Sequence, residues 1–256
     1  MATPRKALLI DITKCIGCQA CEQSCKELHH LPPEHEPTLS ATAFTVVEDR
    51  NGKFIRRLCM HCEDPACASS CPVGAIKKTY EGPVRYDGSK CIGCRYCMLA
   101  CPFGIPKYQW SKLAPYVTKC DLCAERVLAG QPTRCAEVCP TGATAFGDRD
   151  EMLREARKRL VEDPNYVQHI YGEQEVGGTS VFYISDVEFE KLGFITPPMN
   201  QPLPTLTASA LGEVPTVVTI GGSLLAGLYW ISLRRREVAL AEAEEQLARE
   251  QQKARS

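Results

Sequence analysis

The cysteines of this 256-residue chain constrain its fold more than any other feature of the sequence. All 16 lie between Cys15 and Cys139, in four groups of four. Each group ends in C-x3-C, and a proline follows the last cysteine of the second, third and fourth groups. In chain order the groups are Cys15, Cys18, Cys21 and Cys25; Cys59, Cys62, Cys67 and Cys71; Cys91, Cys94, Cys97 and Cys101; and Cys120, Cys123, Cys135 and Cys139. The chain must therefore accommodate four crowded sets of thiols.

The spacing within the groups indicates iron–sulfur ligation. The first and third groups have the C-x2-C-x2-C-x3-C run of bacterial ferredoxins, whereas the second and fourth carry longer loops before their third cysteine. A short loop wraps three iron corners of a cubane cluster, and Gly17 and Gly93 allow close approach of the backbone. The fourth cysteine then ligates a neighbouring cluster, which interlocks two motifs. Sixteen ligands therefore predict four 4Fe–4S clusters.

Two other uses of many cysteines fit the pattern less well. Secreted disulfide scaffolds are usually short and spread their cysteines through the chain. Structural zinc sites use C-x-x-C pairs, but a tetrahedral ion has no use for the additional closely spaced cysteines of these groups. A membrane-anchored structural zinc protein is thus the distant alternative.

The gap between the second and third groups indicates how the groups pair. It holds two short β-like runs, Ala75–Ile76 and Val84–Tyr86, around a Gly-Pro turn. Groups two and three therefore predict one compact two-cluster unit, inserted into a second unit made of groups one and four. From spacing alone, pairing group one with two and group three with four stays open.

Charges and motifs outside the cysteines limit the classes of function. The formal net charge is −1, which gives no indication of nucleic-acid binding. No dinucleotide, phosphate-loop, acyl-transfer or zinc-protease motif occurs, so we expect no catalytic residues and no enzyme activity of the chain alone. Glu63 and Asp64 are expected to be surface charges. His61 lies within C-M-H-C but is not expected to be a ligand, because the thiolate set is complete without it.

Basic residues lie beside the cysteine groups. They are candidates to offset the negative charge of thiolate-bound clusters and so tune their potentials, the alternative for each being an ordinary surface charge. These residues are Lys14, Arg56, Arg57, Arg95, Lys107, Lys119 and Arg134.

Beyond the last cysteine, the sequence predicts a helix, a strand and a linker. Residues 148–163 predict a helix with Asp148 as its cap and Met152, Ala156 and Leu160 along one face. Residues 176–186, V-G-G-T-S-V-F-Y-I-S-D, predict a strand after a turn. Residues 197–205, P-P-M-N-Q-P-L-P-T, predict a semi-rigid linker.

The following segment predicts a single transmembrane helix. Residues 214–233 include no charge and would span about 30 Å as a helix, enough to cross a bilayer. Pro215 suits a first helical turn, and Ser223 and Gly227 provide a small-xxx-small face for a partner helix. Tyr229 and Trp230 lie near the far end, as in an aromatic belt.

The charges after this segment predict its orientation. Arg234, Arg235 and Arg236 follow at once, and basic flanks favour the cytoplasmic side. We therefore expect a cytoplasmic C terminus, a helical tail over residues 235–256, and a cysteine-rich domain in the periplasm of a bacterium, anchored to the inner membrane. Met1–Ile10 is too short for a secretory signal.

Several motifs together resemble one protein family. They are D-I-T-K-C-I-G-C, C-M-H-C-E-D-P, C-R-Y-C-M-L-A-C-P-F-G-I-P, K-C-D-L-C, C-P-T-G-A and V-G-G-T. Residues 7 to 190 resemble the iron–sulfur (beta) subunit of membrane-bound formate dehydrogenases, and also the related subunit of periplasmic uptake hydrogenases, within the molybdopterin-oxidoreductase electron-transfer family.

The resemblance implies nested cluster ligation. Its four ligand sets are Cys15, Cys18, Cys21 and Cys139; Cys25, Cys120, Cys123 and Cys135; Cys59, Cys62, Cys67 and Cys101; and Cys71, Cys91, Cys94 and Cys97. The expected fold is α+β, with two nested ferredoxin-like units in residues 1–150 (the inner one at 59–101), an arm at 151–210, the membrane helix at 211–234 and the tail at 235–256.

The resemblance also implies a function and a route of export. The chain would relay electrons between a catalytic molybdopterin formate dehydrogenase subunit and a membrane cytochrome b or the quinone pool. A nickel–iron hydrogenase or another molybdenum reductase is the alternative partner. Beta subunits of this family lack a signal and are exported folded beside a twin-arginine partner, whereas the hydrogenase relatives typically have their own signal.

Overall fold

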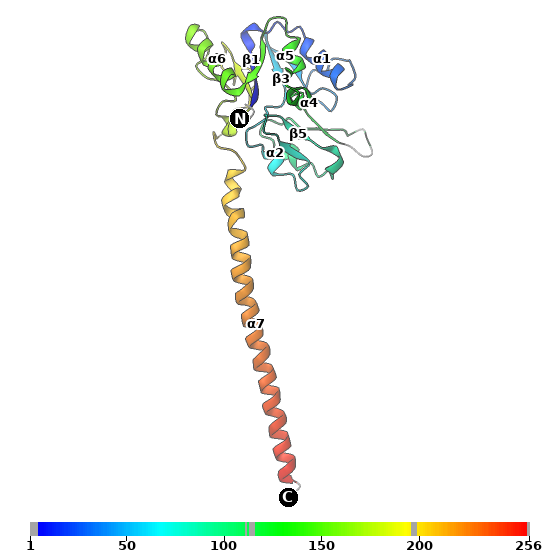
Figure 1. The fold of residues 1–256 in the computed structure, drawn as a ribbon, viewed down its shortest axis with the longest axis vertical. Helices are drawn as coiled ribbons and strands as arrows, with labels where there is room; N and C mark the ends of the chain where they lie inside the picture. Colours follow the sequence, from blue (N-terminus) through cyan, green and yellow to red (C-terminus); the bar gives the residue numbers. More distant parts are fainter. Residues whose placement is uncertain (1–4, 111, 113–115, 196–198, 255–256) are drawn as a thin grey trace. The chain divides into compact units, whose positions relative to one another are not determined.

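The computed structural model describes residues 5–110, 112, 116–195 and 199–254 (Figure 1). The chain divides into two compact units, Met1–Thr205 and Leu206–Ser256. The first unit contains every cysteine and combines short strands with short helices, as expected for an α+β fold. The second unit is helical throughout its described residues.

The elements are short wherever the cysteines lie. The strands are β1 (Lys6–Asp11), β2 (Val46–Arg50), β3 (Lys53–Arg57), β4 (Ile76–Lys78), β5 (Val84–Tyr86), β6 (Lys107–Tyr108), β7 (Val117–Thr118), β8 (Thr144–Asp148) and β9 (Val181–Ile184). The α-helices are α1 (Ala20–Leu28), α2 (Ala66–Ser69), α3 (Tyr96–Ala100), α4 (Ala124–Leu128), α5 (Arg134–Glu137), α6 (Arg149–Glu162) and α7 (Thr205–Ala254). Short 3-10 helices are η1 (Ile12–Lys14), η2 (Gly88–Lys90) and η3 (Glu175–Gly177).

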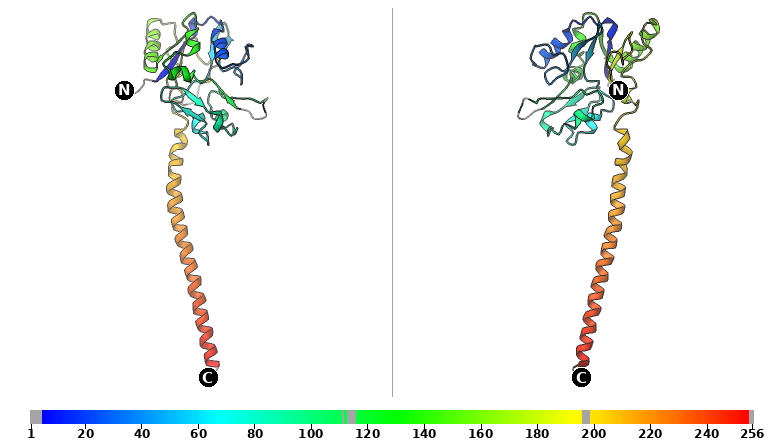
Figure 2. Two further views of the ribbon diagram at one scale, coloured as in Figure 1. Left: turned by 45° about the vertical axis from the view of Figure 1, so that its right-hand side comes forward. Right: turned by 180° about the vertical axis from the view of Figure 1, so that it is seen from behind.

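Strand β1 lies at the centre of a three-stranded sheet in the order β8-β1-β9. It pairs antiparallel with β8 and parallel with β9, the latter lying in the segment predicted as a strand. Its apolar run A-L-L-I is buried on both faces, and alternate side chains of a strand face opposite sides of the sheet. Figure 2 shows α6 on one side of this sheet and the cysteine-bearing helices on the other.

Helix α6 covers one face of the sheet. Ala7 and Leu9 of β1 pack there in one apolar cluster with the buried face of the helix, Leu153, Ala156 and Leu160. Met152, predicted to lie along this face, is only partly buried. Asp148 occupies the N-cap position as predicted, but its side chain makes no capping bond, because it pairs with Lys6 instead.

The other face of β1 looks toward the cysteines. Leu8 and Ile10 belong to a second apolar cluster that includes Met60 of the second cysteine group and Leu122 and Cys135 of the fourth. The cysteine motifs therefore pack against this face of the sheet. Its position follows from the alternation of a strand that is apolar on both sides.

Three antiparallel hairpins carry the remaining strands: β2–β3, β4–β5 and β6–β7. The pair β4–β5 confirms the hairpin predicted between the second and third groups, with Ile76 opposite Tyr86 and Lys78 opposite Val84. Ala75 lies just outside the strand. Two-stranded ribbons of this length hold little apolar core of their own.

Glu63 is not the surface charge that the sequence suggested. Its side chain is 14% exposed and pairs with Arg5, Lys78 and Arg149. Ser180 donates a hydrogen bond of 3.0 Å to the carboxylate. The prediction was wrong because these partners lie on distant segments; the neighbouring Asp64 is exposed, as expected.

Replacing Glu63 by glutamine should destabilise the protein by about 1–3 kcal/mol, because three cations lose their shared anion. Burial alone would raise the pKa of Glu63, but Lys78, Arg149 and the Ser180 bond hold it below its ordinary value. The stability that the charge contributes is thus lost only as pH falls through that lowered pKa. Anaerobic denaturation should give the same difference at about pH 6 and about pH 8. D64N is the control; a difference that disappears near pH 6 would contradict the assignment.

Helix α7 runs unbroken from Thr205 to Ala254 and is, by length and composition, long and apolar enough to cross a membrane. It begins before the predicted start, since residues 205–211 include helix-forming Leu and Ala. Pro215 therefore lies inside the helix rather than in its first turn, a position that membrane-spanning helices tolerate. Of the predicted linker, residues 197–198 lie outside the described residues and Thr205 is already helical.

Candidate functional site

Two of the cysteine groups are introduced by the same local structure. Residues 11–18 read D-I-T-K-C-I-G-C and residues 87–94 read D-G-S-K-C-I-G-C. In each, an aspartate caps a 3-10 turn that ends at the first cysteine. The Asp11 carboxylate accepts hydrogen bonds from the Thr13 N–H at 3.1 Å and the Thr13 hydroxyl at 2.6 Å. The Asp87 carboxylate accepts from the Ser89 N–H at 3.0 Å and the Ser89 hydroxyl at 2.6 Å. No role was predicted for these aspartates from the sequence, although the repeated D-x-[TS]-K pattern marks both of them.

The glycines within these loops have the conformation that the motif requires. Gly17 and Gly93 have φ of +71° and +72°, where a side chain is strained. A Cβ on Gly17 would also lie 2.5 Å from the Phe54 ring. The glycines therefore allow the backbone of each loop to approach a bound cluster closely, as predicted.

The two capping aspartates differ in burial. Asp11 is fully buried, and its other carboxylate oxygen accepts from Arg159 Nη1 at 3.1 Å and from the Tyr166 hydroxyl at 2.9 Å. Asp87 has no such distant partners among the described residues and is 45% exposed. Asp11 therefore connects the first cysteine loop to α6, whereas Asp87 stabilises only the turn in which it lies.

Asp11→Ala should lower the apparent unfolding temperature by about 10 °C, because a buried cation and hydroxyl lose their anionic partner. Asp87→Ala, the matched control in the repeated motif, should produce only a slight change. Both are measured by anaerobic thermal unfolding of the iron-loaded protein, followed by circular dichroism. Equal effects of the two substitutions would show that the distant contacts of Asp11 contribute nothing.

The cysteines of groups one and four surround two adjacent cavities. One cavity is lined by Cys15, Cys18, Cys21 and Cys139. The other is lined by Cys25, Cys120, Cys123 and Cys135. Helix α1, which carries Cys21 and Cys25 one turn apart, packs against α5, which carries Cys135. Each cavity thus combines three cysteines of one group with the last cysteine of the other.

The cysteines of groups two and three interleave in the same way. Burial raises the pKa of the Cys62 thiol well above its ordinary value, and the nearby Cys59, Cys101 and Cys67 raise it further. Burial, followed by the charges of Cys91, Cys94 and Cys71, raises the pKa of Cys97 to about 11. Helix α2, with Cys67, packs on α3, with Cys97. Cys101 therefore lies among the cysteines of group two, and Cys71 among those of group three.

These thiol sets fit iron–sulfur clusters better than single ions. Burial raises the pKa of both Cys21 and Cys123 to about 11, so four thiolates in one site need a cationic core to stay ionised. A zinc ion holds its thiolates about 2.3 Å from one point. Among the residues that the structure describes, no three potential ligands converge for a single ion, although four cysteines line each cavity.

Backbone N–H groups point at several of the sulfurs. Ala75 donates to Cys71 Sγ at 3.2 Å, Gly93 to Cys91 Sγ at 3.4 Å and Leu122 to Cys120 Sγ at 3.4 Å. Such bonds stabilise thiolates and orient metal ligands. The loops therefore supply part of the polar environment that a bound cluster requires.

The basic residues predicted to tune the cluster potentials differ in burial and in their partners. Arg56 and Lys119 are buried. Arg95 lies over the rings of Tyr108 and Trp110, and Lys107 donates to the Gly104 carbonyl. Arg134 pairs with Glu137, and Lys14 is 45% exposed. Only a minority of these cations therefore reach the protein interior.

His61 is also buried, but its contact is with the backbone. Its Nδ1 accepts a hydrogen bond of 2.9 Å from the Val84 N–H, which links the C-M-H-C loop to β5. This ring nitrogen is therefore engaged in holding two segments together.

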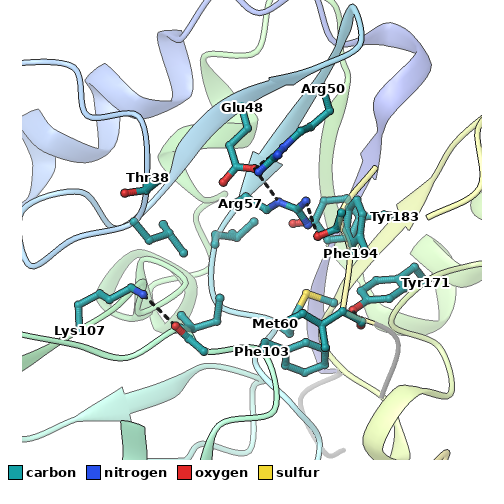
Figure 3. A pocket seen from close by; sticks show the side chains of 16 residues that line it. Thr38, Glu48, Arg50, Arg57, Met60, Phe103, Lys107, Tyr171, Tyr183 and Phe194 are labelled. Atoms are coloured by element: carbon teal, nitrogen blue, oxygen red, sulfur yellow. Dashed lines mark hydrogen bonds and ion pairs between the residues drawn. The ribbon is translucent and has the colours of Figure 1, made fainter. Parts of the chain in front are cut away.

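A separate surface hollow of about 270 Å³ lies beside β3 (Figure 3). Arg57 projects into it, donates to the carbonyls of Leu192 and Gly193 at 2.7 and 3.0 Å, and pairs with Glu48 at 3.4 Å. Its guanidinium lies 4.1 Å from the centre of the Phe194 ring. None of the cysteines lines this hollow.

Comparison with known proteins gives consistent matches. The model of a 4Fe–4S dicluster domain matches residues 51–149, which contain groups two, three and four. A protein of Nitratidesulfovibrio vulgaris is 41% identical over 257 residues, covering 93% of this chain and 70% of that protein. The hydrogenase-2 operon protein HybA of Escherichia coli O157:H7 is 37% identical over 233 residues, 72% of this chain and 71% of HybA. The iron-sulfur subunit of the nitrate-inducible formate dehydrogenase of Escherichia coli K12 is 40% identical over 199 residues, 70% of this chain and 67% of that subunit.

Proposed function

Because the chain belongs to the family of iron–sulfur electron-transfer subunits of formate dehydrogenase and hydrogenase complexes, we propose that its cysteines hold four 4Fe–4S clusters in two nested pairs. The chain is an electron-transfer subunit rather than a catalytic one. The ligand sets that we propose are Cys15, Cys18, Cys21 and Cys139 (site one); Cys25, Cys120, Cys123 and Cys135 (site two); Cys59, Cys62, Cys67 and Cys101 (site three); and Cys71, Cys91, Cys94 and Cys97 (site four). The observation that carries the proposal is the pair of four-cysteine cavities that combine groups one and four.

The proximity of cysteines in different sets supports a relay through the sites in numerical order. Burial is the main cause of the raised pKa of Cys21 in site one, and Cys135 of site two lies close enough to raise it further. Cys59 of site three does the same for Cys120 of site two, and Cys97 of site four for Cys67 of site three. A bound 4Fe–4S cluster would accept and release one electron at a time. The residues of this chain bury the sites, order them and supply hydrogen bonds to their sulfurs.

The proposed partners lie at the two ends of this relay. Related chains are subunits of formate dehydrogenase and hydrogenase complexes. We favour a molybdopterin formate dehydrogenase as the catalytic partner, with a nickel–iron hydrogenase as the alternative, and a membrane cytochrome b or the quinone pool at the other end. Molybdenum or nickel in the anaerobically purified complex discriminates between the two catalytic partners.

The proposed location is the bacterial inner membrane. Helix α7 would cross it once, over residues 211–234, with the cluster domain (residues 1–150) and the arm (151–210) in the periplasm and the tail (235–256) in the cytoplasm. The apolar helix and the arginines that follow it support this orientation. A reporter fused after Ser256 should be active only in its cytoplasmic form; activity of a periplasmic reporter would reverse the orientation.

Metal analysis tests the cofactor proposal directly. Anaerobically purified protein should contain about sixteen iron atoms and about sixteen acid-labile sulfides per chain, four of each for every cluster. Stoichiometric zinc without iron would instead identify the structural zinc protein. Iron near eight per chain would show that only one nested pair is occupied.

A further inference from the structure

Arg56 lies between the two cavities formed by groups one and four. It is on strand β3, is 2% exposed, and lines both cavities. The adjacent Arg57 faces the other side of the strand, as strand alternation requires, and lines the surface hollow. Two neighbouring arginines of the same strand thus occupy opposite environments.

The contacts of Arg56 fix its guanidinium in place. Nη2 donates to Cys135 Sγ at 3.1 Å, Nη1 to Thr144 Oγ1 at 2.9 Å and Nε to Thr45 Oγ1 at 3.2 Å. The Tyr183 hydroxyl donates to the Arg56 carbonyl at 2.7 Å. Side-chain and backbone contacts together leave the planar group one orientation, with an edge toward a cysteine of site two.

Among the described residues, the buried charge of Arg56 has no carboxylate partner. In the described part of the chain, no aspartate or glutamate forms an ion pair with it. A buried cation is unfavourable unless an anion compensates it, and arginine does not lose its proton in proteins. Of the nearby groups that can carry negative charge, Cys135 of site two acts most strongly and Cys21 of site one next; Tyr183 is also near, but burial raises its pKa and keeps its hydroxyl neutral. The anionic partner of Arg56 is therefore supplied by the two sites themselves.

We propose that Arg56 is the shared counter-charge of sites one and two and raises the reduction potential of both. The inference rests on the proposed cluster function. Reduction adds one electron to a cluster without breaking a bond, so the site becomes more negative. A fixed cation in a buried, low-dielectric position stabilises that reduced form. The effect is larger at site two, because Arg56 donates a hydrogen bond to its Cys135 ligand.

Redox titration of the membrane-extracted complex, followed by electron paramagnetic resonance, tests this role. Arg56→Met removes the charge and should lower two of the four midpoint potentials. The one-electron equilibrium constant of the more affected cluster should fall at least tenfold, equivalent to about 59 mV. Arg56→Lys keeps the charge and should retain most of the potential. Arg57→Met, on the opposite face of the same strand, is the matched control and should shift neither potential.

The remaining outcomes separate this inference from the proposed function. Iron-replete R56M with wild-type potentials overturns the role of Arg56 alone, as does an equal shift in R57M. If R56M loses iron from sites one and two while R56K keeps it, the need for a counter-charge is supported. Loss of iron in both variants would assign Arg56 a purely structural role, and absence of iron from the wild-type protein would overturn the proposed function itself.

Discussion

Replacing Cys101 by serine should remove the cluster bound mainly by Cys59, Cys62 and Cys67, while the cluster of its sequence neighbours persists. Burial raises the pKa of Cys101, and the nearby Cys59 of group two raises it further; Cys101 in turn raises the pKa of Cys62. Iron should fall by about a quarter if the site empties completely. Alkylation under anaerobic conditions, followed by mass spectrometry, identifies which thiols become reactive.

Cys97→Ser provides the matched control for this experiment, because Cys97 lies only four residues away in the same group. Its loss should expose Cys71, Cys91 and Cys94 and leave Cys59, Cys62 and Cys67 protected. If C101S exposes Cys91 and Cys94 instead, each group binds its own cluster and the nested arrangement is wrong. The two serine variants thus give opposite alkylation patterns under the proposed ligation.

Removing the iron should unfold the inner unit while the β8-β1-β9 sheet and α6 remain folded. The apolar cluster that holds the inner unit contains its residues Cys67, Ile76, Val84 and Cys97 together with Val117 of β7, so it depends on cysteines that would no longer be held. The cluster between the sheet and α6 contains no cysteine. Metal ligation supplies folding free energy wherever the apolar core is too small.

Hydrogen exchange of the chelator-treated protein measures this difference. Amides of β4 and β5 should lose most of their protection, whereas those of β9 and α6 should change little. Treatment with an equally charged, non-chelating compound is the control. Uniform loss of protection through the first unit would show that the sheet and α6 also depend on the clusters.

Much of the local structure was predictable because it depends on neighbouring residues. The β4–β5 hairpin and the helix after Asp148 lie where their short sequence patterns placed them, and β9 lies within the predicted segment 176–186 but occupies only Val181–Ile184. The positive φ of Gly17 and Gly93 likewise follows from the loop that surrounds them. Boundaries were less certain: α7 extends well before the uncharged run, because ordinary helix formers continue it.

Residues that act through distant partners were not predictable in this way. The carboxylate of Asp11 meets Arg159 and Tyr166 only because α6 packs beside β1. The burial of Glu63 is not predictable from its neighbours, because its cationic partners Arg5 and Arg149 come from other segments. Sequence patterns describe neighbours along the chain, and these contacts join residues that are far apart in it.

Cysteine number and spacing alone were enough to indicate iron–sulfur chemistry, because ligand type and loop length limit which metal centres a short segment can wrap. Which groups share a cavity could not be told from spacing, because it depends on the packing of α1 on α5, which brings thiols more than a hundred residues apart around the same cavities. The different placement of Arg56 and Arg57 depended on which face of β3 looks inward. The core residues packed against β3 determine which face points inward. Arg56 is therefore buried beside cysteines, whereas Arg57 lines a hollow at the surface.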